Sequence, residues 1–136
     1  MDNRSGLFMV MRRNRRKFAR YGVGSLGVSL HRTGLLGLVF GKMDVRAIDF
    51  NATGLAFRHS RPLSPGQPVL MDLVTAQYRV SRVVAVARYI TRMENHFRCG
   101  VEFDFDANEH MRSDVVKNTL KNIETLLNEV VILTAD

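Results

Sequence analysis

The chain has 136 residues and a mass of 15.4 kDa, with 46% hydrophobic and 24% charged residues, which is the size and composition of one globular domain. Its formal net charge is +7, and its single cysteine, Cys99, excludes an intramolecular disulfide framework or a multi-thiolate zinc site. No apolar run reaches the roughly 18 residues of a membrane span, and none has the features of a signal peptide. We therefore expect a cytoplasmic protein that does not insert into membranes.

Most of the net charge comes from the amino-terminal residues. Residues 1–20 contain six arginines and one lysine against one aspartate, whereas the remaining 116 residues hold 13 basic and 12 acidic side chains. A nearly neutral body with a basic leader is typical of a protein that binds an anion, although a solvated cationic tail is the simpler interpretation. We expect an N-terminal tail over residues 1–11 and one domain over residues 12–136, beginning with an arginine-rich leader at 12–20.

Residues 21–105 are expected to form strands. Six of the ten glycines lie between Tyr21 and Gly41, which disfavours helix and favours short strands with bends. Apolar residues occupy the odd positions from Phe97 to Phe105, as in a half-buried strand, and Ser64-Pro65-Gly66 predicts a turn. The other predicted strands cover residues 45–50, 54–58, 69–74 and 78–90. About six short strands with one buried face close most economically as a barrel.

The spacing of the apolar residues changes after Phe105. Asp106–Glu109 resembles a capping box. Apolar residues then recur at helical spacing, at Val116, Leu120, Ile123, Leu127 and Val130, with Val115, Leu126 and Val131 beside them. This stripe predicts one amphipathic helix over residues 107–132. The expected fold class is therefore mainly all-β, a six-stranded antiparallel barrel with a C-terminal α-helix, and the helix leaves open a homodimer through its apolar stripe.

Several familiar motifs fail on their context. Gly22–Gly27 spells G-x-G-x-x-G, but an arginine-rich segment precedes it and more glycines follow it, so a nicotinamide or flavin site is not expected. The four histidines share no metal-ligand spacing with one another or with Cys99. No arrangement of a nucleophile and a base can be argued from the sequence. We expect no enzyme, no catalytic residue, no metal and no cofactor.

Two short motifs occur together in an order that chance explains poorly. Residues 16–20 read R-x-x-x-R, with Arg15 just before them, and Asp49–Gly54 read D-x-N-x-x-G at the end of a predicted strand. With Gly100-Val101-Glu102-Phe103 as a G-V-x-F strand, the sequence resembles the PilZ family of bacterial receptors for cyclic di-GMP. The family signature is R-x-x-x-R followed by D/N-x-S-x-x-G on a six-stranded barrel with a trailing helix, and Asn51 stands where the family has serine.

The resemblance implies a nucleotide site. Its cyclic di-GMP-binding residues would be Arg15, Arg16, Arg20, Asp49, Asn51 and Gly54. A guanidinium donates in pairs to phosphate oxygens or to guanine O6 and N7, and a carboxylate accepts from guanine N1–H and N2–H₂. Glycine permits the close approach that a side chain would block. Binding would fold the flexible leader onto the barrel and so signal to a downstream protein partner.

Two other functions stay open. A degenerate PilZ-like module would not bind nucleotide and would act through protein–protein interaction. A barrel that binds single-stranded nucleic acid would need a basic groove with stacking aromatic residues on adjacent strands. The eight phenylalanines and three tyrosines are scattered, and the body outside the leader is almost neutral, which disfavours the nucleic-acid alternative.

Overall fold

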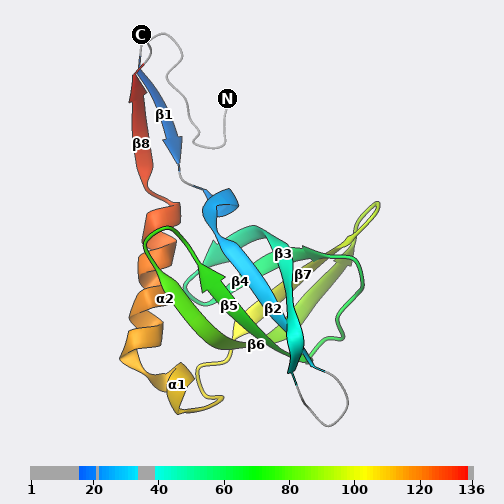
Figure 1. Ribbon diagram of the computed structural model, residues 1–136. Coiled ribbons are helices and arrows are strands. Elements are labelled where there is room, and N and C mark those ends of the chain that lie inside the picture. Colours follow the sequence, from blue (N-terminus) through cyan, green and yellow to red (C-terminus); the bar gives the residue numbers. More distant parts are fainter. Residues whose placement is uncertain (1–15, 21, 34–38, 135–136) are drawn as a thin grey trace.

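Six strands of the computed structural model close into an antiparallel barrel (Figure 1). The structure describes residues 16–20, 22–33 and 39–134. The barrel strands are β2 (Gly27–Thr33), β3 (Val39–Asn51), β4 (Gly54–His59), β5 (Pro68–Val74), β6 (Arg79–Arg92) and β7 (Phe97–Phe103). Their order around the barrel is β2-β3-β4-β7-β6-β5, and β5 pairs with β2 to close it. The predicted fold class is confirmed.

The barrel core follows the alternation of the strands. In β7, Cys99, Val101 and Phe103 are buried, and the residues between them face outward. Cys99 is fully buried, as the alternation predicts, and burial raises the pKa of its thiol. Phe105, expected inside this strand, lies beyond its end and packs at the edge of the core.

Two bulges decide which side chains reach the outer face. Ala47 pairs with Phe57 and Asp49 with Ala56, so Ile48 is an extra residue in β3. A strict alternation from buried Ala47 would turn Asp49 inward, but the bulge turns it outward. The same irregularity occurs in β6, where Arg88 is the extra residue beside Tyr89.

The prediction of one helix over residues 107–132 is wrong. The chain forms α1 (Glu109–Arg112) and α2 (Asp114–Leu127), separated at Ser113, whose backbone is extended. Asn108 caps α1 by accepting a hydrogen bond from Met111 N, and Ser113 caps α2 by accepting one from Val116 N. The cap of the first helix is thus Asn108 rather than Asp106.

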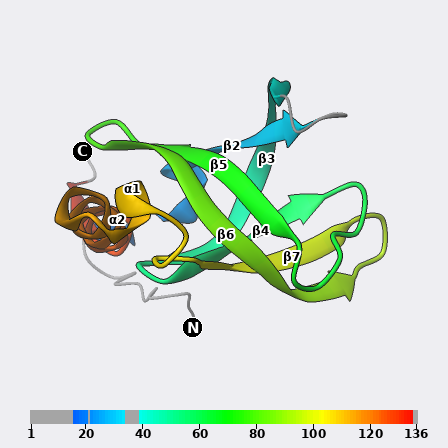
Figure 2. The ribbon, with the colours of Figure 1, turned by 90° about the horizontal axis from the view of Figure 1, so that it is seen from below.

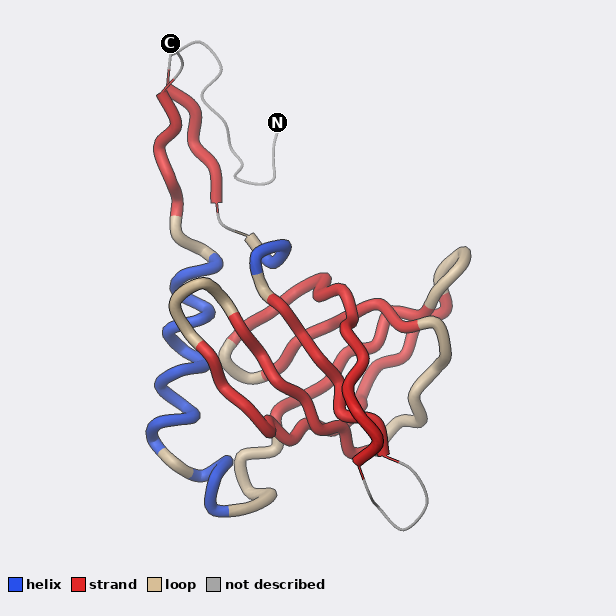
Figure 3. Tube along the Cα trace, in the orientation of Figure 1, coloured by secondary structure: helices blue, strands red, loops and turns tan. Residues whose placement is uncertain are grey.

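The chain after α2 returns to strand. β8 (Val130–Thr134) pairs antiparallel with β1 (Arg16–Arg20), so that Arg16 lies opposite Thr134 and Arg20 opposite Val130. This two-stranded ribbon extends beyond the carboxyl end of α2, away from the barrel (Figures 1 and 3). Gly22 N donates to Leu127 O at 3.0 Å and ties the base of the ribbon to the helix. The leader was expected to be flexible, but residues 16–20 have strand backbone because β8 offers them a pairing edge.

Between the ribbon and the barrel the chain forms a short 3-10 turn, η1 (Val23–Ser25), and then enters β2. The G-x-G-x-x-G segment therefore leads into a strand, where a dinucleotide-binding turn would lead into a helix.

Helix α2 lies beside the barrel and shares its core (Figure 2). Val116, Leu120, Ile123 and Leu127 are buried in one cluster with barrel residues, whereas Val115 is 75% exposed. Most of the predicted stripe is therefore used inside the chain, and the homodimer through this helix stays a prediction. Among the described residues, no helix combines the length and apolar character needed to cross a membrane.

Candidate functional site

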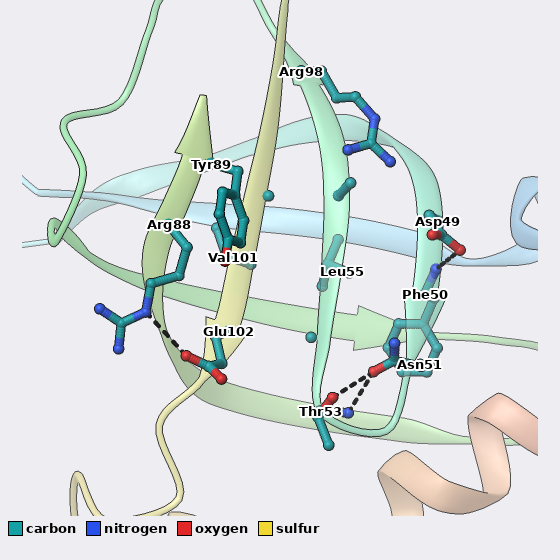
Figure 4. Close-up of a pocket in the computed structure, with 13 residues that line it drawn as sticks. Asp49, Phe50, Asn51, Thr53, Leu55, Arg88, Tyr89, Arg98, Val101 and Glu102 are labelled. Carbon is teal, nitrogen blue, oxygen red and sulfur yellow. Dashed lines mark hydrogen bonds and ion pairs between the residues drawn. The ribbon is translucent and has the colours of Figure 1, made fainter. Parts of the chain in front are cut away.

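A cavity of about 480 Å³ lies on the outer face of the barrel, over strands β3, β4, β7 and β6 (Figure 4). Its lining includes three predicted site residues, Asp49, Asn51 and Gly54, together with Arg88, Tyr89, Arg98, Gly100 and Glu102. A larger cavity of about 890 Å³, between β2, β5 and the loop after β4, is lined by none of the predicted site residues.

The floor of the first cavity is made by small residues. Asp49, Ala56, Gly100 and Tyr89 stand opposite one another on four neighbouring strands. Ala56 and Gly100 occupy the middle of this row, so the larger side chains of Asp49 and Tyr89 form its two ends. Tyr89 is 76% exposed, which is unusual for so large an apolar ring. The result is a slot with a carboxylate at one end and an aromatic ring at the other.

Asn51 shapes the turn between β3 and β4. Its Oδ1 accepts hydrogen bonds from Thr53 N at 2.8 Å and from Thr53 Oγ1 at 2.7 Å, which is an Asx turn (Figure 4). The amide oxygen is therefore occupied, while the amide nitrogen remains a donor. A Cβ at Gly54 would clash with the carbonyl oxygen of Val101, so glycine lets β4 approach β7 closely here.

Helix α2 anchors the same turn from behind. Glu124 Oε1 accepts a hydrogen bond from Ala52 N at 3.0 Å, across 72 positions of sequence. In β3, just before the turn, Asp49 Oδ1 accepts a hydrogen bond from Phe50 N at 2.9 Å, and the carboxylate stays exposed to solvent. The turn that carries Asn51 and Gly54 is thus fixed both locally and by the helix.

The charges around the cavity are unevenly distributed. Arg88 Nε lies 3.0 Å from Glu102 Oε1, so these two groups largely neutralise each other. The Arg98 side chain extends across β4 toward the strand that carries Asp49 (Figure 4). In the part of the chain that the structure describes, no three histidine, cysteine, aspartate or glutamate side chains gather as a metal site would require. Beside the Arg88–Glu102 pair, the charged side chains of the lining are Arg98 and Asp49.

The predicted site residues of the leader belong to β1 or directly precede it in the sequence. Arg16 and Arg20 lie in β1, where the structure describes the backbone only, and Arg15 lies outside the described residues. The structure therefore brings together Asp49, Asn51 and Gly54 and leaves the positions of the arginine side chains undescribed.

The sequence analysis missed Tyr89, Arg88 and Arg98 as lining residues. Alternation along β7 does put Arg98 on the polar face, but only the pairing of β7 with both β4 and β6 brings it to the cavity.

Comparison with known proteins supports the fold and goes no further. No protein-family model matches the chain, and no curated protein matches it. Among solved structures, the chain is similar to YcgR from Escherichia coli, determined in complex with c-di-GMP, with a TM-score of 0.52 and 15% sequence identity. The match covers 83% of this chain and 45% of the YcgR chain, so this chain spans less than half of that protein.

Proposed function

We propose that this chain is a receptor for cyclic di-GMP with no catalytic activity of its own. The ligand would lie in the cavity over β3, β4, β7 and β6, held by Asp49, Asn51 and Gly54. Arg15, Arg16 and Arg20 of the leader would complete the site. The strongest support is that the D-x-N-x-x-G residues line a cavity whose floor is made by small residues, in a chain whose fold is similar to that of YcgR solved with c-di-GMP.

The shape and chemistry of the slot suit a guanine base. Asp49 can accept from guanine N1–H and N2–H₂, and the exposed Tyr89 ring offers a stacking surface. The small residues Ala56 and Gly100 leave room for a planar ring against the sheet. Because its oxygen is already bonded, Asn51 would act as a donor through its amide nitrogen.

The ribbon gives binding a way to change the surface of the protein. A two-stranded ribbon is only marginally stable by itself, so β1 can exchange its pairing with β8 for contacts to a bound anion at little cost. Such an exchange would uncover the edge of β8 and alter what a downstream protein partner meets.

Isothermal titration calorimetry with cyclic di-GMP tests the proposal, with GTP, cyclic di-AMP and a single-stranded oligonucleotide as controls. We expect saturable binding of cyclic di-GMP alone. Arg16→Ala or Arg20→Ala should lower affinity by about 2–4 kcal/mol, because each truncates one partner of a charged, hydrogen-bonded pair. Asp49→Ala should cost less, and Arg4→Ala is the matched control with little effect. Binding by Arg16→Ala as tight as that of the parent would show that the proposed site is wrong.

One observation favours the degenerate module as the second candidate. The amide oxygen of Asn51, at the position of the family's serine, is already bonded to Thr53, and the leader backbone is already paired with β8. No heat with any nucleotide would select a module that acts through protein–protein interaction.

A further inference from the structure

Three arginines on neighbouring strands form one row beside the cavity. Arg46 of β3 stands opposite Arg58 of β4, and Arg58 stands opposite Arg98 of β7. We call these three residues the arginine row. Like charges directly opposite each other destabilise an antiparallel sheet, so the row costs the free protein some stability.

No ion pair among the described residues joins the arginine row to an acid; the ion pairs found there involve Asp72 and Glu102. Asp49 follows Arg46 in β3 and lines the cavity together with Arg98. Asp44 lines a neighbouring cavity together with Arg46, so the three arginines share this part of the barrel with two aspartates and keep an excess of positive charge.

The row is also firmly positioned. Arg58 and Arg98 are half-buried, and all three residues sit on hydrogen-bonded strands of a closed barrel. Groups on rigid elements lose less freedom when they bind than groups on a leader. A guanidinium fork matches the paired oxygens of a phosphodiester. A preorganised cluster of arginines that form no ion pair among the described residues is what an anion site needs.

We propose that the arginine row is an anion-binding surface of the barrel wall, and that Arg98 contacts a phosphodiester of a guanine dinucleotide lying in the cavity. The identity of that ligand rests on the proposed function. The row supplies positive charge on the barrel itself, independently of the leader. Cyclic di-GMP binding by an Arg16→Ala, Arg20→Ala double variant is then weak, still measurable, and weakened further by added salt.

Calorimetric titration of full-length variants with cyclic di-GMP tests the role of Arg98. Arg98→Gln keeps the length and polarity of the side chain but removes the charge, and should raise the Kd at least about tenfold. Arg98→Lys keeps the charge but lacks the paired donors of a guanidinium, so its Kd should lie between those of the parent and Arg98→Gln. The matched control is Arg79→Gln, which removes an exposed arginine at the start of β6, outside the cavity lining, and should leave the Kd within about twofold. Thermal unfolding of each variant shows that it is folded.

Inorganic pyrophosphate provides a second readout that does not depend on the nucleotide. It should raise the unfolding midpoint of the parent and of Arg79→Gln, and raise that of Arg98→Gln much less. If the parent and Arg98→Gln bind cyclic di-GMP equally, the inference is overturned and the proposed function survives. If the parent does not bind cyclic di-GMP, but pyrophosphate raises its unfolding midpoint more than that of Arg98→Gln, the proposed function is wrong and the anion-binding surface is supported. No effect of either ligand overturns both.

Discussion

Glu124 is the side chain through which α2 holds the turn that carries Asn51 and Gly54. Glu124→Ala removes the acceptor of the 3.0 Å hydrogen bond from Ala52 N. A hydrogen bond to a charged group contributes about 1.5–3 kcal/mol when buried. Ala52 is half-buried and water can partly replace the carboxylate, so we expect the free energy of unfolding to fall by about 1–2 kcal/mol. The higher helix propensity of alanine offsets a few tenths of a kcal/mol.

Urea denaturation followed by circular dichroism measures this loss, and hydrogen exchange of the Ala52 amide measures the bond itself. Glu124→Gln keeps a carbonyl oxygen that can accept, so it should lose less stability than Glu124→Ala. Lys121→Ala, at an exposed position of the same helix, is the matched control. Because the loosened turn carries site residues, Glu124→Ala should also weaken cyclic di-GMP binding. If Glu124→Ala and Lys121→Ala unfold alike and the Ala52 amide exchanges at the parent's rate, the helix does not hold the turn.

Two further predictions follow from the cavity floor and from Asp72. In Gly100→Ala the new Cβ would lie 3.5 Å from Tyr89 O and 3.6 Å from Tyr89 Cβ, which are ordinary contacts, so the thermal unfolding midpoint should change little. The added methyl group raises the cavity floor and should weaken cyclic di-GMP binding. Unchanged affinity would show that Gly100 does not form the floor of the binding site. Burial opposes ionisation of Asp72, but hydrogen bonds from Lys42 Nζ and Arg82 N and the nearby His31 outweigh it and lower its pKa from 3.8 to about 2. The stability from this depressed pKa is present above pH 3.8 and is lost as the pH falls toward 2, about 2 kcal/mol in all. Chemical denaturation at pH 5 and pH 2 should show a smaller acid loss for Asp72→Asn than for the parent, and equal losses would refute this role.

Features with a local cause could be predicted from the sequence. The alternation in β7 identified its buried face, because the strand is regular and one face meets the core. The turn at Ser64–Gly66 has the expected glycine, with a φ of 87° at Gly66 and a hydrogen bond from Gln67 N to Ser64 O at 2.9 Å. The helical stripe held as far as Leu127, because those positions face the barrel.

Features that depend on distant partners could not be predicted. Val130 and Val131 continue the helical spacing, yet valine suits a strand equally well, and β1 offers its edge from more than a hundred residues away. The outward direction of Asp49 depends on the bulge at Ile48, which no periodicity reveals. Arg98 lines the same cavity as the D-x-N-x-x-G residues because β7 lies between β4 and β6 in the barrel.

The most direct test of the account is to titrate the isotope-labelled chain with cyclic di-GMP and follow the backbone amide signals by NMR. The account predicts saturable shifts concentrated at Asn51–Gly54, at Gly100–Glu102 and along β1 and β8, with little change around Leu70 in the larger cavity. Shifts confined to the larger cavity, or no shifts at saturating ligand, would contradict it.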